Sequence, residues 1–425
     1  MGVFFRFELQ FVPAIARRAA TLDARPAPPS TPTEVEVMVV TPAREIWVSA
    51  ARLSDRAGLY QIAICAGRIT AIVPQDYTPQ PAAIDLGGDW LSLGGVDLQI
   101  NGALGLPFPN LTPDRLPQLQ AICEYLWQQG IDAFLPTLVT SPIASMRQAI
   151  ATIAAFLETP QLPGQAQILG VHLEGPFLNP DKRGAHPQQH LQPLTLANLQ
   201  HLLDDLPPVV KLITLAPELD PTGEAIAYLQ DRGIAVSLGH SQATAAETKT
   251  AGDRGATMVT HAFNAMPRLH HREPGLLGAA LTDPRFWCGC IADGQHICPT
   301  MLEILVRAGR DRLFLVSDAL APLGLGDGDY PWDSRVVTVR DGTAHLEDGT
   351  LAGTTLPLLV GTQNLARWGI CDPGAAIALA TNAPRAALGL PGLAIGQPAM
   401  LLRWSWDARL RTLTWQRLQL ARPEP

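Results

Sequence analysis

The sequence lacks a long apolar run. A helix that crosses a membrane needs roughly 18 or more consecutive apolar residues, and none of the 425-residue chain's runs reaches that length. The first segment, "MGVFFRFELQFVPAIARR", is interrupted by Arg6 and Glu8 and has no clean signal-peptide core. We therefore expect a protein with no membrane association and a cytoplasmic location.

An excess of basic residues is also missing. Lys and Arg number 31 against 39 Asp and Glu, which gives a formal net charge of −8. A chain that binds polyanions in general carries a positive balance, so we expect no nucleic-acid partner. A local basic cluster can still bind a small phosphate group.

The six cysteines form no CxxC pair and no regular disulfide framework, which suits a reducing compartment. Cys288, Cys290 and Cys298 fit no common zinc spacing, so buried thiols are the simpler interpretation. Neither GxGxxG nor GxxxxGK[ST] opens a helix, which disfavours a doubly wound nucleotide-binding sheet.

Short apolar runs alternate with helix-period segments through the middle of the chain, a rhythm typical of repeated βα units on a parallel sheet. Several of the helical segments end at a glycine. Eight units of this kind predict a (β/α)8 TIM barrel at 92–391, with strands at 95–101, 133–140, 168–175, 209–218, 235–241, 258–264, 286–294 and 313–319.

The two ends of the chain have a different texture. Segments 34–91 and 392–425 alternate apolar and polar residues between turn signals, so we expect them to pair into one small β-sandwich domain. Residues 1–33 are predicted to be a flexible lead-in. Residues 324–350 are expected to form a β-hairpin insertion after the eighth strand.

Ionisable side chains occur at four predicted strand ends: Glu174, His240, His261 and Asp318. The carboxyl ends of the strands of a parallel barrel open onto one face, where active sites are built. Burying a carboxylate such as Glu174 without a partner costs several kcal/mol. Two imidazoles and one carboxylate are a ligand set for a catalytic divalent cation, and they predict a metal centre.

Two nearby groups have other expected roles. His172 lies two residues before Glu174 and points to the same face one layer deeper, so we expect it to support the ligands from below or to belong to the core. Asp318 beside a metal-activated water could act as general base and then general acid, with a helix N-cap as the alternative.

Five segments together resemble the N-acetylglucosamine-6-phosphate deacetylase family of the amidohydrolase superfamily over about residues 90–390. They are "HLEGPFLNPDKRGAH", "SLGHSQAT", "THAFNAMPRLHHREPGLLGA", "IADGQHICP" and "LVSDALAPLG". The resemblance implies Glu174, His240 and His261 as metal ligands, Asp318 as the acid–base residue and His186 as the group that polarises the carbonyl and steadies the oxyanion. It implies one divalent metal per subunit, with Zn²⁺ expected and Fe²⁺, Mn²⁺ and Co²⁺ as alternatives.

The same resemblance implies a phosphorylated amino sugar as substrate, deacetylated with release of acetate. Its substrate-binding positions carry over to Ala185, His186, Asn264, Ala265, Arg272, His296 and the "LAG" turn of Leu351, Ala352 and Gly353. A guanidinium can bind phosphate bidentately, which suits Arg272. In the family this arginine can reach across a dimer interface, so a homodimer is implied.

One position departs from the wider superfamily. Gln99 and Asn101 stand where many amidohydrolases carry an HxH pair, and Lys211 is at the start of the fourth strand rather than its end. Amides bind transition metals poorly beside imidazole, so we expect a mononuclear site.

Three alternatives remain. The protein could deacetylate N-acetylgalactosamine 6-phosphate, which differs at one hydroxyl, and the sequence does not separate the epimers. A cyclic-amide hydrolase of the same superfamily is disfavoured by the missing HxH pair. A catalytically silent scaffold is disfavoured because each predicted ligand and the acid–base residue are present.

Overall fold

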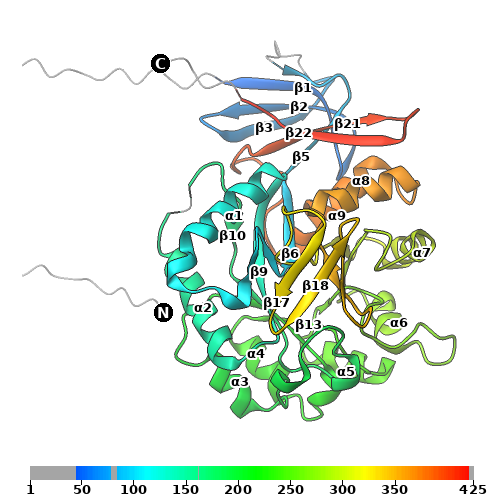
Figure 1. Cartoon of the computed structure of the whole chain (residues 1–425). Helices are drawn as coiled ribbons and strands as arrows, with labels where there is room; N and C mark the ends of the chain where they lie inside the picture. Colours follow the sequence, from blue (N-terminus) through cyan, green and yellow to red (C-terminus); the bar gives the residue numbers. More distant parts are fainter. Residues whose placement is uncertain (1–44, 78–83, 161, 421–425) are drawn as a thin grey trace, which may run out of the picture. The chain divides into compact units, whose positions relative to one another are not determined.

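The computed structural model describes residues 45–77, 84–160 and 162–420. Its centre is a parallel barrel around which the chain alternates strand and helix (Figure 1). The eight strands, in barrel order, are β6 (Gly95–Ile100), β9 (Ile131–Val139), β11 (Val171–Glu174), β12 (Val210–Leu215), β13 (Ala235–Leu238), β14 (Met258–Val259), β15 (Trp287–Cys290) and β16 (Leu313–Leu315). All eight predicted strands are present, and the predicted fold class is confirmed.

The barrel closes between the chain just after β16 and the end of β6. The Asp318 N–H donates to the Gln99 carbonyl at 2.9 Å, and the Asn101 N–H donates to the Ala319 carbonyl at 2.7 Å. A parallel bridge joins Ile100 and Ala319. Two strands that are remote in sequence therefore meet at a seam held by backbone hydrogen bonds.

Helices cover the outside of the barrel. Local signals define several of their ends: Thr244 and Glu247 form a capping box before α5, and Asp372 caps α9 with Pro373 as its first residue. The helices are α1 (Leu116–Gln128), α2 (Ile143–Leu157), α3 (Leu196–Leu203), α4 (Glu224–Asp231), α5 (Ala245–Asp253), α6 (Gly275–Thr282), α7 (Pro299–Gly309), α8 (Leu358–Trp368), α9 (Pro373–Ala380) and α10 (Asn382–Ala387).

Strand alternation divides the apolar residues between two layers. In β6, Val96 and Leu98 point into the barrel interior, where they pack with Phe314 and other inward residues. In β9, Phe134 and Leu138 face the helices instead. The interior of the barrel is therefore a packed core rather than a channel.

The two terminal segments form a second, seven-stranded sheet in the order β22-β21-β5-β1-β2-β3, with β4 against β1. The segments expected to pair into a β-sandwich do form one small β domain built from both ends, and its described strands belong to a single sheet rather than two. The predicted lead-in 1–33 and residues 34–44 lie outside the described residues. The strands are β1 (Ile46–Leu53), β2 (Arg56–Cys65), β3 (Arg68–Pro74), β4 (Ile84–Asp85), β5 (Trp90–Leu93), β21 (Leu401–Asp407) and β22 (Thr412–Arg417).

The expected insertion follows β16 as a four-stranded antiparallel sheet of β17 (Gly328–Trp332), β18 (Arg335–Arg340), β19 (Thr343–Leu346) and β20 (Leu351–Thr354). The prediction of a turn at Leu351–Gly353 is wrong, because these residues belong to strand β20, which pairs with β19. Short elements complete the fold: β7 (Gly102–Ala103), β8 (Leu106–Pro107) and β10 (Gln167–Ile168).

A buried ionic network joins the small sheet to the amino-terminal end of the barrel. Asp132, 2% exposed at the start of β9, accepts hydrogen bonds from the Gly94 N–H at 2.6 Å and from Arg385 and Arg417 at 3.0 Å each. Arg417 belongs to β22 and also stacks on Trp127, its guanidinium carbon 3.3 Å from the ring centroid. One carboxylate thus links three parts of the fold.

We predict that Asp132→Ala lowers the free energy of unfolding by about 3–5 kcal/mol, because it leaves the buried Arg385 and the half-buried Arg417 without their anion. Urea unfolding followed by circular dichroism measures the change. Asp329→Ala, which removes an exposed carboxylate 3.8 Å from Arg340, is the matched control and should change it by less than about 0.5 kcal/mol. Equal effects of the two substitutions would contradict the role of the network.

Candidate active site

A cavity of about 440 Å³ opens at the carboxyl ends of the barrel strands. Its lining includes all four predicted strand-end residues, Glu174, His240, His261 and Asp318. They come from chain segments up to 144 residues apart, since the first is 174 and the last is 318. Parallel strands bring them together because each lies at, or just after, the carboxyl end of its own strand.

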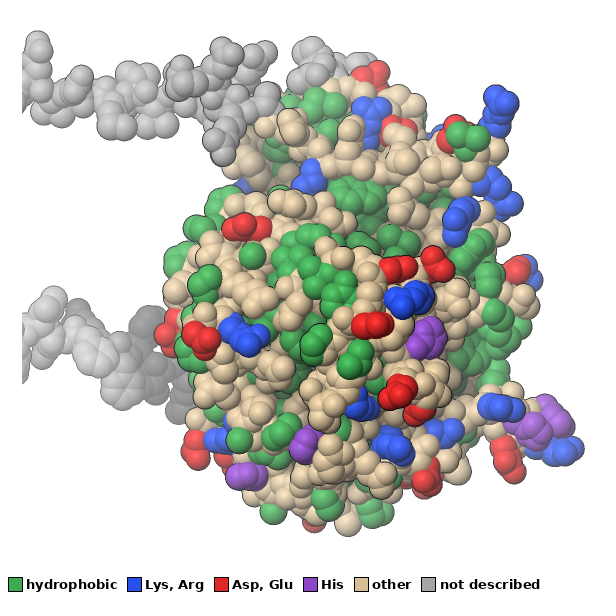
Figure 2. Space-filling view, viewed as in Figure 1, with side chains coloured by type: hydrophobic (Ala, Val, Ile, Leu, Met, Phe, Trp, Pro, Cys, Tyr) green, Lys and Arg blue, Asp and Glu red, His purple; other side chains and the backbone are tan. Residues whose placement is uncertain are grey.

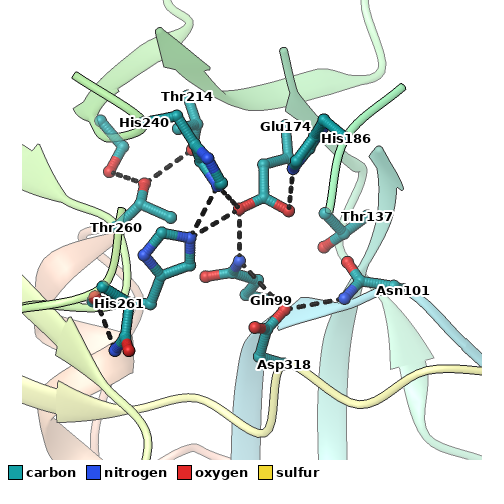
Figure 3. A network of polar contacts seen from close by, with 12 residues as sticks. Gln99, Asn101, Thr137, Glu174, His186, Thr214, His240, Thr260, His261 and Asp318 are labelled. Carbon is teal, nitrogen blue, oxygen red and sulfur yellow. Dashed lines mark hydrogen bonds and ion pairs between the residues drawn. The ribbon is translucent and has the colours of Figure 1, made fainter. Parts of the chain in front are cut away.

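Three of these side chains converge on one point (Figure 3). Glu174 Oε1 lies 3.3 Å from His240 Nε2 and 3.1 Å from His261 Nε2, and the two ring nitrogens are 2.9 Å apart. Ligands of one tetrahedral zinc ion, bound at about 2.0–2.1 Å, lie roughly 3.3 Å from each other. The spacing and the carboxylate–imidazole chemistry therefore fit a divalent cation.

A neighbouring carbonyl sets the orientation of His240. Its Nδ1 lies 2.8 Å from the Lys182 carbonyl oxygen, which can only accept, so Nδ1 carries the ring proton. The lone pair is then on Nε2, the atom that faces Glu174. This is the arrangement in which a metal-ligating histidine is held by its second nitrogen.

The electrostatics of the cluster keep Glu174 ionised. Burial alone would raise the pKa of this carboxyl, but hydrogen bonds with His240 and His261 hold it well below its usual range. Burial opposes the charge on His261, yet the Glu174 carboxylate raises the pKa of that imidazole. The Glu174 carboxylate is thus a buried anion that is able to bind a cation.

The backbone is strained at these positions. His240, His261 and Asp318 have φ values of 47°, 28° and 48°, in the left-handed region that is uncommon for residues other than glycine. Each follows a barrel strand at the point where the chain leaves the sheet. Such outliers concentrate at functional sites, where the surrounding structure holds them.

His186 reaches the site on the loop after β11. The chain turns at Gly175, where φ is 86° and a Cβ atom would come 2.3 Å from Thr140 Oγ1. His186 Nε2 lies 3.8 Å from Glu174 Oε2. Burial, followed by the charge of His240, lowers the pKa of His186 to about 3, so its ring is neutral near pH 7.

Thr140 determines which nitrogen of His186 carries the proton. The Thr140 backbone N–H lies 3.3 Å from Nδ1 and can only donate, and its hydroxyl lies 2.9 Å from the same atom. Nδ1 is therefore the acceptor and the proton is on Nε2. His186 presents an N–H donor toward the space beside Glu174.

Asp318 is held by two amides from the end of β6. Asn101 Nδ2 donates to Oδ1 at 2.7 Å and Gln99 Nε2 donates to the same atom at 3.2 Å. Burial, together with the charge of Glu174, raises the pKa of Asp318 to about 6. A carboxyl group with this pKa can both accept and release a proton near neutral pH.

The cavity also contains most of the predicted substrate-binding residues: Ala185, His186, Asn264, Ala265, His296, Leu351 and Ala352 line it. Gly353 is buried next to the lining rather than part of it. Arg272 is not among the lining residues and lies in the exposed loop 268–274 before α6, which extends outward in Figure 1. In Figure 2 a projection at the right edge carries His and Lys or Arg side chains together, as this loop does.

The remaining sequence expectations concern groups outside the cluster. His172 is buried below it and bonds to the Leu98 carbonyl at 3.0 Å and to Thr214 Oγ1 at 2.8 Å, as a core histidine would. Lys211 is exposed near the start of β12, away from the strand ends.

Sequence reasoning did not find three residues that orient the site. Thr140, the Lys182 carbonyl and Asp293, which accepts from His296 Nδ1 at 2.7 Å, hold the histidines in place. Thr140 follows β9, so the rule that selected Glu174 could have found it. A backbone carbonyl leaves no signal in the sequence.

Comparisons with known proteins agree with this geometry. A family model described as the amidohydrolase family matches residues 90–414. Human N-acetylglucosamine-6-phosphate deacetylase is 39% identical over 314 residues, covering 72% of this chain and 76% of that protein. N-acetylgalactosamine-6-phosphate deacetylase of Escherichia coli O157:H7 is 34% identical over 336 residues, covering 79% and 86%.

A solved structure gives the same result. The crystal structure of N-acetylglucosamine-6-phosphate deacetylase from Pasteurella multocida superposes with a TM-score of 0.75 at 28% identity, covering 88% of this chain and 100% of that one. The family resemblance read from the motifs is therefore confirmed. From its barrel, the cluster of ionisable side chains at its strand ends and these matches, the chain belongs to the amidohydrolase family.

Proposed function

We propose that this protein hydrolyses the acetamide bond of N-acetylglucosamine 6-phosphate, producing glucosamine 6-phosphate and acetate. The observation that carries the proposal is the convergence of Glu174, His240 and His261 beside Asp318 and His186 in one cavity. The names of the relatives indicate the substrate class. The activity would serve the use or recycling of amino sugars.

The ligand set implies a divalent cation, and members of this superfamily are metal-dependent. Glu174, His240 and His261 would hold it, with Zn²⁺ as the proposed ion since imidazole and carboxylate ligands suit it. When bound, such an ion polarises a carbonyl and lowers the pKa of water. The proton transfers and the stabilisation of the oxyanion are assigned to the side chains of Asp318 and His186.

Asp318 accepts a proton from the attacking water as the oxygen bonds to the acetamide carbon. The carbonyl oxygen gains negative charge, and the His186 Nε2–H donates to it, which typically contributes a few kcal/mol. Asp318 then returns its proton to the amide nitrogen. The C–N bond breaks, and the amine and acetate leave.

Phosphate recognition is proposed for Arg272 in the exposed loop 268–274. Because this residue does not line its own chain's cavity, we propose that it reaches the cavity of a second copy in a homodimer. A bidentate guanidinium–phosphate contact would select phosphorylated sugars. Ala185, Asn264, Ala265, His296 and the start of β20 would hold the sugar.

N-acetylgalactosamine 6-phosphate is the second candidate substrate, because a relative 34% identical over 79% of this chain bears that name. The two sugars share the acetamide and the phosphate and differ in the orientation of one hydroxyl.

Among the described residues no helix is both long and apolar enough to cross a membrane. A cytoplasmic location remains a prediction, and so do the domain limits 1–33, 34–91, 92–391 and 392–425.

Acetate release from phosphorylated and free N-acetylhexosamines tests the proposed function. We expect turnover of N-acetylglucosamine 6-phosphate with a strong preference over the free sugar. Arg272→Ala should raise KM for the phosphorylated sugar about 10- to 100-fold and leave that of the free sugar nearly unchanged. Absence of acetate from every phosphorylated sugar, with metal bound, would overturn the function.

Removal of the proposed base should separate turnover from metal binding. Asp318→Asn is expected to lower kcat by about 10²- to 10⁴-fold, the usual contribution of general acid–base catalysis. Elemental analysis should still find one metal ion per chain, because the ligand set is intact. A variant with near-normal kcat would remove Asp318 from this role.

The raised pKa of Asp318 predicts an acid limit to activity. Its carboxyl must be ionised to accept a proton, so kcat/KM should fall about tenfold per unit as the pH drops below about 6. A cation bound beside it favours the ionised form and moves this limit lower. A fall that begins above about pH 7 and persists in Asp318→Glu would contradict the assignment.

A further inference from the structure

Two buried amides at the end of β6 make the direct hydrogen bonds to Asp318. Gln99 and Asn101 are 2% and 4% exposed. Asn101 Nδ2 donates to Asp318 Oδ1 at 2.7 Å, and Gln99 Nε2 donates to that oxygen at 3.2 Å and to Glu174 Oε1 at 2.7 Å. Figure 3 shows Gln99 between the two carboxylates.

The chemistry of these contacts fixes the direction of both amides. An ionised carboxylate can only accept hydrogen bonds, so the NH₂ end of each amide must face it. In the described part of the chain, both side-chain hydrogen bonds to this carboxylate go to Oδ1. Oδ2 is thereby left as the oxygen available for proton transfer.

The same two residues also hold the strained backbone at Asp318. Its N–H donates to the Gln99 carbonyl at 2.9 Å, and the next residue accepts from the Asn101 N–H at 2.7 Å. Gly353 packs against the other side, where φ is 151° and a Cβ atom would come 2.7 Å from the Asp318 carbonyl oxygen. Main chain and side chain of Asp318 are therefore both fixed from β6.

We propose that Gln99 and Asn101 are positioning residues for the proton-transfer step: they hold Asp318 through Oδ1, so that Oδ2 accepts and returns the proton, and Gln99 fixes this base relative to Glu174. The inference rests on the proposed function. Uncharged donors suit the task, because a lysine or arginine at the same place would form an ion pair with the carboxylate and weaken it as a base.

The contact to Glu174 gives Gln99 a second effect. The amide nitrogen of Gln99 carries two hydrogens, and it lies 2.7 Å from Glu174 Oε1 and 3.2 Å from Asp318 Oδ1. Two carboxylates that would otherwise repel each other are thus linked by a neutral donor. Gln99 therefore bridges the proposed metal ligand and the proposed base.

The test compares wild-type enzyme with Gln99→Met and Asn101→Ala, using N-acetylglucosamine 6-phosphate as substrate. Methionine has nearly the shape of glutamine without its donor. We expect kcat to fall about 10- to 100-fold in each variant, the usual effect of losing a hydrogen bond to a charged group. KM should stay within about threefold and metal content at one ion per chain, because none of the proposed metal ligands or sugar-binding residues is replaced.

Gln118→Met is the matched control. Gln118 is a half-buried glutamine whose amide donates to the Leu104 carbonyl at 3.0 Å, away from the cavity lining, so the same chemical change should leave kcat within about twofold. Thermal unfolding shows whether each variant is folded. If Asn101→Ala does not fold, Gln99→Met decides the question alone.

Wild-type kcat in Gln99→Met would overturn the inference, and so would a loss of metal parallel to the loss of activity, which would assign the amide to the ligand set. A rise in KM with unchanged kcat would also overturn it, because the amides would then serve binding. Inactivity of the wild-type enzyme on every phosphorylated sugar is a separate outcome, which refutes the proposed function itself.

Discussion

The site depends on one buried carboxylate. Glu174 ends an apolar strand and lies among imidazoles rather than in water, an arrangement that is unfavourable for an anion without a cation partner. His240 and His261 direct ring nitrogens to the same oxygen, and the Lys182 carbonyl sets the tautomer of His240. The barrel places these groups together, and their spacing suits the proposed divalent cation.

A second constraint is the closing seam of the barrel. The chain after β16 joins the end of β6 through backbone hydrogen bonds, and the side chains of Gln99 and Asn101 act at the same place on Asp318. The end of β6 therefore both closes the barrel and orients the proposed base. A barrel that closed in another register would place a different residue opposite these amides.

Much of this architecture was predictable from sequence. Eight apolar runs separated by helical segments predict the barrel, and the rule that strand ends face the active site selects Glu174, His240, His261 and Asp318. The sequence motifs indicated the site residues because each motif lies at the carboxyl end of a barrel strand. Arg272 is different, because no pattern within the loop 268–274 indicates where a partner chain would lie.

Other parts could not be predicted, for physical reasons. From the sequence, Gln99 and Asn101 indicate only that the HxH imidazoles are missing. Their hydrogen bonds to Asp318 could not be predicted, because they join two strands that meet only in the closed barrel. The tautomer of His186 depends on Thr140, which is 46 residues away in sequence. The strand conformation of Leu351–Gly353 depends on pairing with β19, which local composition does not specify.

The ionic network around Asp132 lies at the start of β9, whereas the cavity lies at the opposite ends of the barrel strands. The Asp132 network and the candidate active site thus lie at opposite ends of the same scaffold. Substitutions near Asp132 could therefore change the stability of the fold without altering the residues of the cavity. Enzymes whose stabilising contacts are interwoven with their reactive groups do not have that freedom.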